Sequence, residues 1–351
     1  MAHISPTYKL LKIDEKSFLV FYLTNQGEEV YVSTLVKQRE EKVKTRDAYG
    51  EVLPRIGEKD EDIVVLTADL AGSTRTKYFA EEFPERFFNV GITEANMMGM
   101  AAGLAMEGKK PFVSTFSIFA TGKPWEQIRQ TIAYQSAPVR IVATHAGLTV
   151  GEDGASHQIL EDISLMRVLP NMKVIVPADS TQTKAVIERI GKDLSGPVYV
   201  RLARAGFPVV YEDCDFEIGK AEVLTEGSDL TIFATGLMVA NSLDAADDLA
   251  DQGISAEVVN VSTIKPLDVD TVLESVEKTG RALTVEEHNV IGGLGSAVSE
   301  VVSEGHPVPL KRVGVEDRFG ESGPAYELIE HFGLTSDRIA EEGESLLDGE
   351  L

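Results

Sequence analysis

The chain has 351 residues, 33 basic and 57 acidic, with a net charge of -24. This length suits two domains of ordinary size, and the negative charge disfavours nucleic acid and anionic membrane surfaces as partners. Its single cysteine, Cys214, excludes an internal disulfide and indicates a reducing, cytoplasmic compartment, and the apolar run 18–23 is too short to cross a membrane.

The first 42 residues differ in composition from the rest of the chain. β-Branched and aromatic residues fill 17–23 and 29–36, on either side of Asn25-Gln26-Gly27, and this pattern predicts a hairpin. Residues 1–42 are therefore expected to be an N-terminal extension. They are either an added hairpin or a stretch upstream of the natural start of the protein.

From residue 43 to residue 204 short apolar runs alternate with helical segments, which predicts parallel strands joined by crossover helices. The predicted strands are 63–67, 112–114, 139–143, 173–176 and 198–201, and the predicted helices are 47–57, one from residue 92, 124–134, 159–165 and 180–190.

The stretch 205–217 contains Gly206, Pro208 and several acidic residues, and it is expected to be a linker. A second alternating series follows in residues 218–351. Its predicted elements are 230–234, 241–251, 256–260, 268–279, 282–286, 294–303 and 310–315. The predicted fold class is therefore α/β, with two consecutive domains built on mainly parallel sheets.

One predicted helix carries a single acid near its start. The segment GITEANMMGMAAGLA (91–105) is small or apolar on almost every face after Glu94, which predicts a helix that is buried all round. Gly99 and Gly103 each disfavour a helix by about 1 kcal/mol relative to alanine, so we expect another backbone to pack closely against them. Glu94 lies in the first turn, where it is either a helix cap or a catalytic carboxyl.

A glycine-rich loop, THAGLTVGEDGASHQ (144–158), carries two histidines and a carboxylate: His145, Asp153 and His157. Imidazoles exchange protons near neutral pH or bind anions, and glycines allow a ligand to approach the backbone. The alternative is a surface turn whose polar residues cap the following helix. The combination favours a substrate-binding loop.

These segments resemble the transketolase family. GITEANMMGMAAGLA, STFSIFATGKPWEQIRQ (114–130) and THAGLTVGEDGASHQ resemble its pyrimidine-binding domain, here residues 43–204. EEHNVIGGLGSAVSE and DRFGESG resemble its C-terminal domain, here residues 218–351. The resemblance covers about residues 43 to 340, with the motifs in the family's order.

The resemblance implies thiamine diphosphate as the cofactor. Glu94 matches the invariant glutamate that hydrogen-bonds the aminopyrimidine ring, and Phe116 and Phe119 match the aromatic pocket around that ring. Asp69, in TADLAGS, matches an aspartate near the cofactor, although it would otherwise be a turn or helix cap. The chain departs from the longer transketolases at Gly122, where they have a tyrosine.

The resemblance also implies a sugar site. His157 and Asp153 match residues that contact the hydroxyls near the reacting carbon. Four further residues match the group that holds the terminal phosphate of the sugar: His145, Arg46, Ser73 and Arg204. We refer to them as the cationic group, after its arginines. Arg201 lies close enough in the sequence to take the place of Arg204.

One part of a complete transketolase is missing. The family holds a divalent metal on the cofactor's diphosphate through a GDG sequence followed 25 to 30 residues later by asparagine, as the resemblance implies, and no such pair is present. We therefore expect a C-terminal subunit of a split transketolase that itself supplies no metal ligand. An N-terminal subunit would bind Mg²⁺ or Ca²⁺ and complete an α2β2 assembly that transfers a two-carbon ketol unit between sugar phosphates of the pentose phosphate pathway.

Three alternatives compete with this hypothesis. A 1-deoxy-D-xylulose-5-phosphate synthase shares the HAGLT and DGA-x-HQ elements, but normally carries both halves in one chain and has other residues after the aromatic pair. The beta subunit of a 2-oxo acid dehydrogenase would lack the paired histidines, His145 and His157. A noncatalytic stabilising subunit would not need Glu94.

Overall fold

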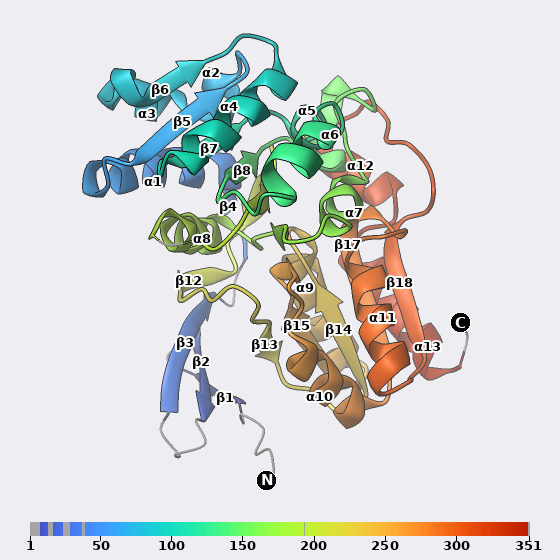
Figure 1. Cartoon of the computed structure of the whole chain (residues 1–351). Helices are drawn as coiled ribbons and strands as arrows, with labels where there is room; N and C mark the ends of the chain where they lie inside the picture. The colour runs from blue at the N-terminus through green and yellow to red at the C-terminus, as the bar shows by residue number, and fades with distance from the viewer. Residues whose placement is uncertain (1–7, 13–16, 24–28, 37–38, 193, 350–351) are drawn as a thin grey trace.

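Two α/β units, each built around its own sheet, make up most of the chain (Figure 1). The computed structural model describes residues 8–12, 17–23, 29–36, 39–192 and 194–349. The predicted class of two consecutive α/β domains with mainly parallel sheets is confirmed.

The first unit contains a seven-stranded sheet in the order β16-β9-β10-β8-β7-β5-β6. Six of its strands are parallel, as predicted for strands with crossover helices. The seventh, β16 (Thr263–Lys265), comes from the second unit and pairs antiparallel with β9, so the two units share this sheet. The parallel strands are β5 (Ile63–Thr67), β6 (Phe87–Asn89), β7 (Lys110–Ser114), β8 (Arg140–Ala143), β9 (Lys173–Ile175) and β10 (Val198–Arg201).

Helices cover both faces of this sheet because their apolar residues recur at helical spacing. In α1 (Thr45–Lys59), Tyr49, Val52, Leu53 and Ile56 are buried and join one core with residues of α8. The predicted helix 124–134 is a short α-helix continued by a π-helical segment, and the helix predicted at 159–165 begins later. The remaining elements are α2 (Ala71–Thr74), α3 (Lys77–Glu82), η1 (Pro84–Arg86), α4 (Glu94–Met106), α5 (Ser117–Thr121), α6 (Trp125–Gln127), η2 (Ile128–Ala133), η3 (Leu148–Asp153), α7 (Asp162–Arg167) and α8 (Ser180–Lys192).

The second unit has a five-stranded sheet in the order β13-β15-β14-β17-β18. Strand β17 (Ala282–Asn289) extends three residues beyond its predicted end, so that Glu286, Glu287 and His288 lie buried within the strand. The other elements are β13 (Glu222–Thr225), β14 (Leu230–Ala234), β15 (Ala256–Asn260), β18 (Leu310–Val315), α9 (Met238–Asp251), α10 (Val269–Thr279), α11 (Leu294–Gly305), α12 (Ala325–His331) and α13 (Ser336–Leu347).

The N-terminal extension forms a sheet with the segment predicted to be a linker. Strands β2 (Ser17–Leu23) and β3 (Glu29–Val36) pair antiparallel, as the predicted hairpin requires, although its Asn25-Gln26-Gly27 turn lies outside the described residues. Strand β1 (Tyr8–Lys12) adds to β2, and β12 (Tyr211–Cys214) adds to β3. A second linker strand, β11 (Gly206–Pro208), pairs with β4 (Lys42–Lys44). The segment 205–217 is therefore folded against the extension, and Figure 1 shows this sheet projecting from the main body.

Helix α4 is not buried all round, contrary to the prediction. Met97, Met98 and Ala101 pack into the core, whereas Met106 is 67% exposed. A Cβ atom added at Gly99 or Gly103 would meet no described atom within 4 Å. No other described backbone of this chain therefore packs against Gly99 and Gly103. The face of α4 that carries these glycines is not covered by the described residues. No helix of the described residues is long and apolar enough to span a membrane.

Candidate functional site

The candidate site lies at the carboxyl ends of the parallel strands of the first sheet. Glu94 begins α4 after β6, Phe116 follows β7, and His145 follows β8. Backbone hydrogen bonds join the last two loops, since Ser117 N donates to Thr144 O at 2.7 Å and Thr144 N donates to Thr115 O at 3.1 Å. Carboxyl ends of parallel strands form the usual ligand-binding edge of α/β sheets.

Three rings form a stack at this edge. The rings of Phe119 and Phe116 lie 6.0 Å apart at 15°, and the ring of His145 lies 3.7 Å from that of Phe116 at 23°. His157 meets both phenylalanines edge-on, with its centroid 5.7 Å from Phe119. The structure thus brings the predicted cofactor-pocket aromatics together with both histidines of the glycine-rich loop.

Glu94 is 3% exposed, and its carboxylate forms an ion pair with Lys123. Lys123 Nζ lies 2.9 Å from Glu94 Oε2 and 6.0 Å from the ring centre of Phe119. Among the described residues, the carboxylate accepts no hydrogen bond from the first amides of α4. The helix-cap interpretation of Glu94 is therefore not supported, and Lys123 links the buried carboxylate to the ring of Phe119.

His145 is held in one tautomer by its neighbours. Arg46 Nη1 donates to His145 Nε2 at 3.2 Å, so the proton of the neutral ring lies on Nδ1, which is 2.8 Å from Thr144 Oγ1. Burial, together with the charges of Arg46, Arg204 and Arg75, lowers the pKa of His145 to about 3. His145 is therefore neutral at physiological pH and orients Arg46.

Cationic side chains gather around His145 despite the overall negative charge of the chain. Arg46 also donates to Ser73 O at 3.1 Å, and its buried Nε has no hydrogen-bond partner among the described residues. Burial and the charge of Arg75 lower the pKa of Arg46, with a further contribution from Arg204. An unpaired buried guanidinium donor among other cations favours an anionic ligand.

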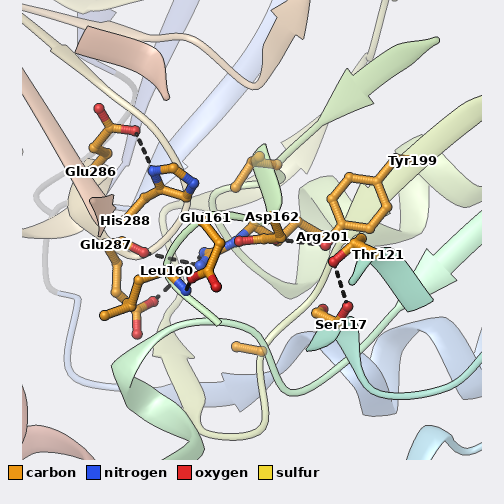
Figure 2. A network of polar contacts seen from close by, with 12 residues as sticks. Ser117, Thr121, Leu160, Glu161, Asp162, Tyr199, Arg201, Glu286, Glu287 and His288 are labelled. Atoms are coloured by element: carbon orange, nitrogen blue, oxygen red, sulfur yellow. Dashed lines mark hydrogen bonds and ion pairs between the residues drawn. The ribbon is translucent and has the colours of Figure 1, made fainter. Parts of the chain in front are cut away.

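Arg201 and Arg204 have different surroundings. Arg201 is buried, donates from Nε to Asp162 Oδ2 at 2.9 Å, and donates from Nη2 to Glu287 O at 2.9 Å (Figure 2). Its Nη1 lies 3.9 Å from Glu287 Oε2. Arg204 is half-buried and binds Val150 O and Glu152 Oε2. The guanidinium of Arg201 is committed to this buried network between the units, so Arg204 remains the candidate for anion binding.

Among the described residues, the side chains of Asp69 and Asp153 form no hydrogen bond or ion pair with this cluster. Asp69 is exposed and accepts from Asn89 Nδ2 at 3.1 Å, while Asn89 Oδ1 accepts from the Asp69 amide at 3.0 Å. These bonds correspond to the turn-capping alternative. Asp153 ends η3 with an exposed side chain.

Four residues of the site and its surroundings were not predicted from the sequence: Lys123, Arg75, Asp162 and Glu287. Lys123 directly follows Gly122, where the sequence departs from the family pattern, but its pairing with Glu94 depends on the tertiary fold. Among the described residues, no group of three or more His, Cys, Asp or Glu side chains would hold a metal ion.

Comparison with known families gives two matches in series. The model "Transketolase, pyrimidine binding domain" matches residues 41–208, and the model "Transketolase, C-terminal domain" matches residues 219–339. Together they span most of the chain.

Individual relatives agree with these matches. The chain is 53% identical over 299 residues to a putative transketolase C-terminal section from Methanocaldococcus jannaschii, which covers 84% of this chain and 93% of the relative. It is 46% identical over 295 residues to a 6-deoxy-6-sulfo-D-fructose transketolase subunit from Clostridium sp. (strain MSTE9), covering 84% and 91%. A solved split-gene transketolase, an inactive beta4 tetramer, superimposes with a TM-score of 0.82 at 51% identity and covers 87% of this chain and 99% of its own.

Proposed function

Because the chain belongs to the transketolase family, we propose that it is the C-terminal subunit of a split transketolase that moves a two-carbon ketol unit from a ketose phosphate to an aldose phosphate. Its family makes it a transferase that depends on thiamine diphosphate. The observation that carries the proposal is the convergence of Glu94, the Phe116–Phe119–His145 stack and the cationic group at one edge of the sheet.

The residues around Glu94 fit the aminopyrimidine of the cofactor. A buried carboxylate accepts a hydrogen bond from a ring nitrogen, and two near-parallel phenyl rings offer an apolar wall for a flat heterocycle. Glu94 would thereby set the protonation state of that ring. The cofactor, when bound, supplies the nucleophilic carbon for ketose cleavage. Asp69 is proposed to lie near the cofactor in the assembled site.

The loop 144–158 and the cationic group fit a sugar with a terminal anion. His157 Nδ1 lies 3.0 Å from Ser156 Oγ, and its Nε2 has no partner among the described residues, so it is free to exchange a proton with a hydroxyl. Asp153 would contact neighbouring hydroxyls. The terminal anion would be bound by Arg46 and Arg204, while neutral His145 orients Arg46 and the Ser73 segment lies beside them.

A separate subunit would complete the site. It would carry the diphosphate-binding domain and most ligands of Mg²⁺ or Ca²⁺, and we propose an α2β2 complex in the cytoplasm. The open face of α4 supports this, because Gly99 and Gly103 leave room for a closely packed backbone that this chain does not provide. The inactive beta4 tetramer of the split-gene relative is consistent with a subunit that needs a different partner for activity.

A relative acts on 6-deoxy-6-sulfo-D-fructose, whose terminal anion is a sulfonate, so a pathway other than the pentose phosphate pathway is compatible with the same cationic group. A 1-deoxy-D-xylulose-5-phosphate synthase is not favoured, since the chain is 53% and 46% identical to a transketolase section and a transketolase subunit but only 38% identical to a synthase from Caldanaerobacter subterraneus. The 2-oxo acid dehydrogenase alternative conflicts with the paired histidines.

Reconstitution tests the function. The chain alone, and the chain mixed with the product of a reading frame that encodes GDG and asparagine at the stated spacing, are assayed for ketol transfer from fructose 6-phosphate and xylulose 5-phosphate. We expect activity only in the mixture, and a loss of at least about 100-fold with Glu94→Ala. Unchanged turnover in this variant would establish a noncatalytic subunit, and strong activity of the chain alone would disprove the split site.

A further inference from the structure

A buried carboxylate of the second unit reaches into the loop that carries the sugar-site residues. Glu287 lies in β17 and is 3% exposed. Its Oε1 accepts a hydrogen bond from the backbone amide of Thr149 at 2.7 Å. Thr149 belongs to η3, between His145 and Asp153, so a single carboxylate fixes the middle of the loop.

The loop backbone lies directly against this carboxylate. Gly147 adopts a φ of +77°, and a Cβ atom at this position would lie 2.3 Å from Glu287 Oε1. Only glycine combines that backbone conformation with such a close approach. The contact between Glu287 and residues 147–149 therefore determines the path of the chain immediately after His145.

Glu287 is itself held by the buried network of Figure 2. Arg201 Nη2 donates to the Glu287 carbonyl at 2.9 Å, and Arg201 Nε donates to Asp162 Oδ2, which also accepts from Tyr199 OH at 2.6 Å. Asp162, Tyr199 and Arg201 come from the first unit. Glu287 is thus tied to the first unit through its main chain as well as through its carboxylate, whose Oε1 accepts from Thr149 and whose Oε2 lies 3.9 Å from Arg201 Nη1.

The other end of the loop is also held by the second unit. Gln158 Nε2 donates to Leu148 O at 3.1 Å and to Glu321 O at 2.9 Å. A Cβ atom at Gly154 would lie 2.3 Å from Ser322 Oγ. Both ends of the segment between His145 and His157 therefore rest on the second unit.

We propose that Glu287 is a positioning residue through which the C-terminal domain sets the conformation of the sugar-binding loop. This inference rests on the proposed function for its catalytic consequence, although its structural consequence is independent. Without the carboxylate, the buried amide of Thr149 loses its acceptor and the loop departs from its position beside Phe116. Glu94, Phe116 and Phe119 stand on other elements and keep their places.

Hydrogen exchange of the purified chain tests the structural part. In Glu287→Ala, exchange of residues 146–158 is expected to rise at least tenfold while β5 (63–67) stays unchanged. Glu287→Gln keeps an acceptor oxygen and is expected to remain within twofold of the natural chain. Unchanged exchange at 146–158, or an equal rise in β5, would overturn the proposal.

Glu286 provides a matched control from the same strand. Its buried carboxylate accepts from the amides of Leu294 at 2.7 Å and Gly295 at 2.8 Å, at the start of α11. Glu286→Ala should loosen residues 292–298 and leave 146–158 protected. Loosening of the sugar loop in this control would show that any buried charge in β17 has the same effect.

The catalytic consequence of the proposal is tested with the reconstituted complex. Glu287→Ala is expected to lower kcat/KM for the ketose at least tenfold, with the Kd for thiamine diphosphate changed less than twofold and with rescue by Glu287→Gln. A loosened loop with unaltered kcat/KM would refute the positioning role. If no complex transfers ketol units, the proposed function fails, whereas the exchange result still decides how the loop is held.

Discussion

Lys123 and Glu94 form an ion pair at the position where the cofactor ring is proposed to bind, with Nζ 2.9 Å from Oε2. The side chain of Lys123 is 58% exposed and that of Glu94 is 4% exposed. The lysine therefore approaches a buried carboxylate from the solvent side and competes with any ligand for it.

Replacing Lys123 by alanine is expected to tighten cofactor binding. An ion pair with one exposed partner contributes about 0.2–1 kcal/mol, so its removal should lower the Kd for thiamine diphosphate in the reconstituted complex by about 1.4- to fivefold. Isothermal titration calorimetry measures this Kd. Lys109→Ala, which removes the surface pair with Asp62, is the matched control and should leave the Kd unchanged. Weaker binding in Lys123→Ala would show that the lysine contacts the cofactor itself.

The open face of α4 predicts opposite effects on folding and on assembly. Gly103→Ala is expected to stabilise the isolated chain by about 1 kcal/mol, since alanine favours a helix and the added Cβ meets no described atom. Gly103→Leu should also fold, but it should fail to assemble with the proposed N-terminal subunit, as measured by analytical ultracentrifugation. Gly57→Ala is the contrasting variant, because its Cβ would lie 2.4 Å from the Phe79 ring and should destabilise the fold. Normal assembly of Gly103→Leu would place the interface elsewhere.

The two neighbouring arginines predict different defects. Arg204→Leu is expected to raise KM for a sugar phosphate about tenfold or more, with little change in thermal stability, because it removes a charged donor from the anion site. Arg201→Leu should lower the free energy of unfolding by about 3–5 kcal/mol, since it leaves Asp162 and Glu287 without their buried counter-charge. Thermal unfolding and steady-state kinetics separate the two. A KM defect without a loss of stability in Arg201→Leu would reverse these assignments.

The surroundings of His145 predict a loss of stability on acidification. Its folded pKa of about 3 lies below the ordinary value of 6.5, so between these values the unfolded chain binds a proton that the folded chain excludes. The stability that the neutral ring contributes is complete above pH 6.5 and is lost progressively as the pH falls toward 3. The loss amounts to about 2 kcal/mol at pH 5. Denaturant titrations at pH 7 and pH 5 should show a smaller loss for His145→Gln than for the natural chain. Equal losses would mean that the folded ring accepts a proton.

Much of the fold and part of the site could be predicted from the sequence because they depend on local patterns. Apolar periodicity located most strands of both units, although not β6, β13 or β16, and the β-branched and aromatic segments on either side of Asn25-Gln26-Gly27 located β2 and β3. Glu94, Phe116 and the histidines of the glycine-rich loop belong to continuous motifs. A continuous motif is visible without knowledge of the fold.

Long-range pairing was decided only by the tertiary structure. Lys123 and Glu94 are 29 positions apart, and Glu287 and Thr149 are 138 positions apart. The strand pairs of segment 205–217, such as Tyr211 with Leu35, are farther apart still. No local sequence pattern predicts contacts over such separations. The same is true of α4, because composition specifies an apolar helix but not whether its second face is covered by this chain. The sequence by itself determined which residues suit the chemistry, whereas the folded chain decided which of them meet, because burial and hydrogen bonding depend on neighbours distant in the sequence.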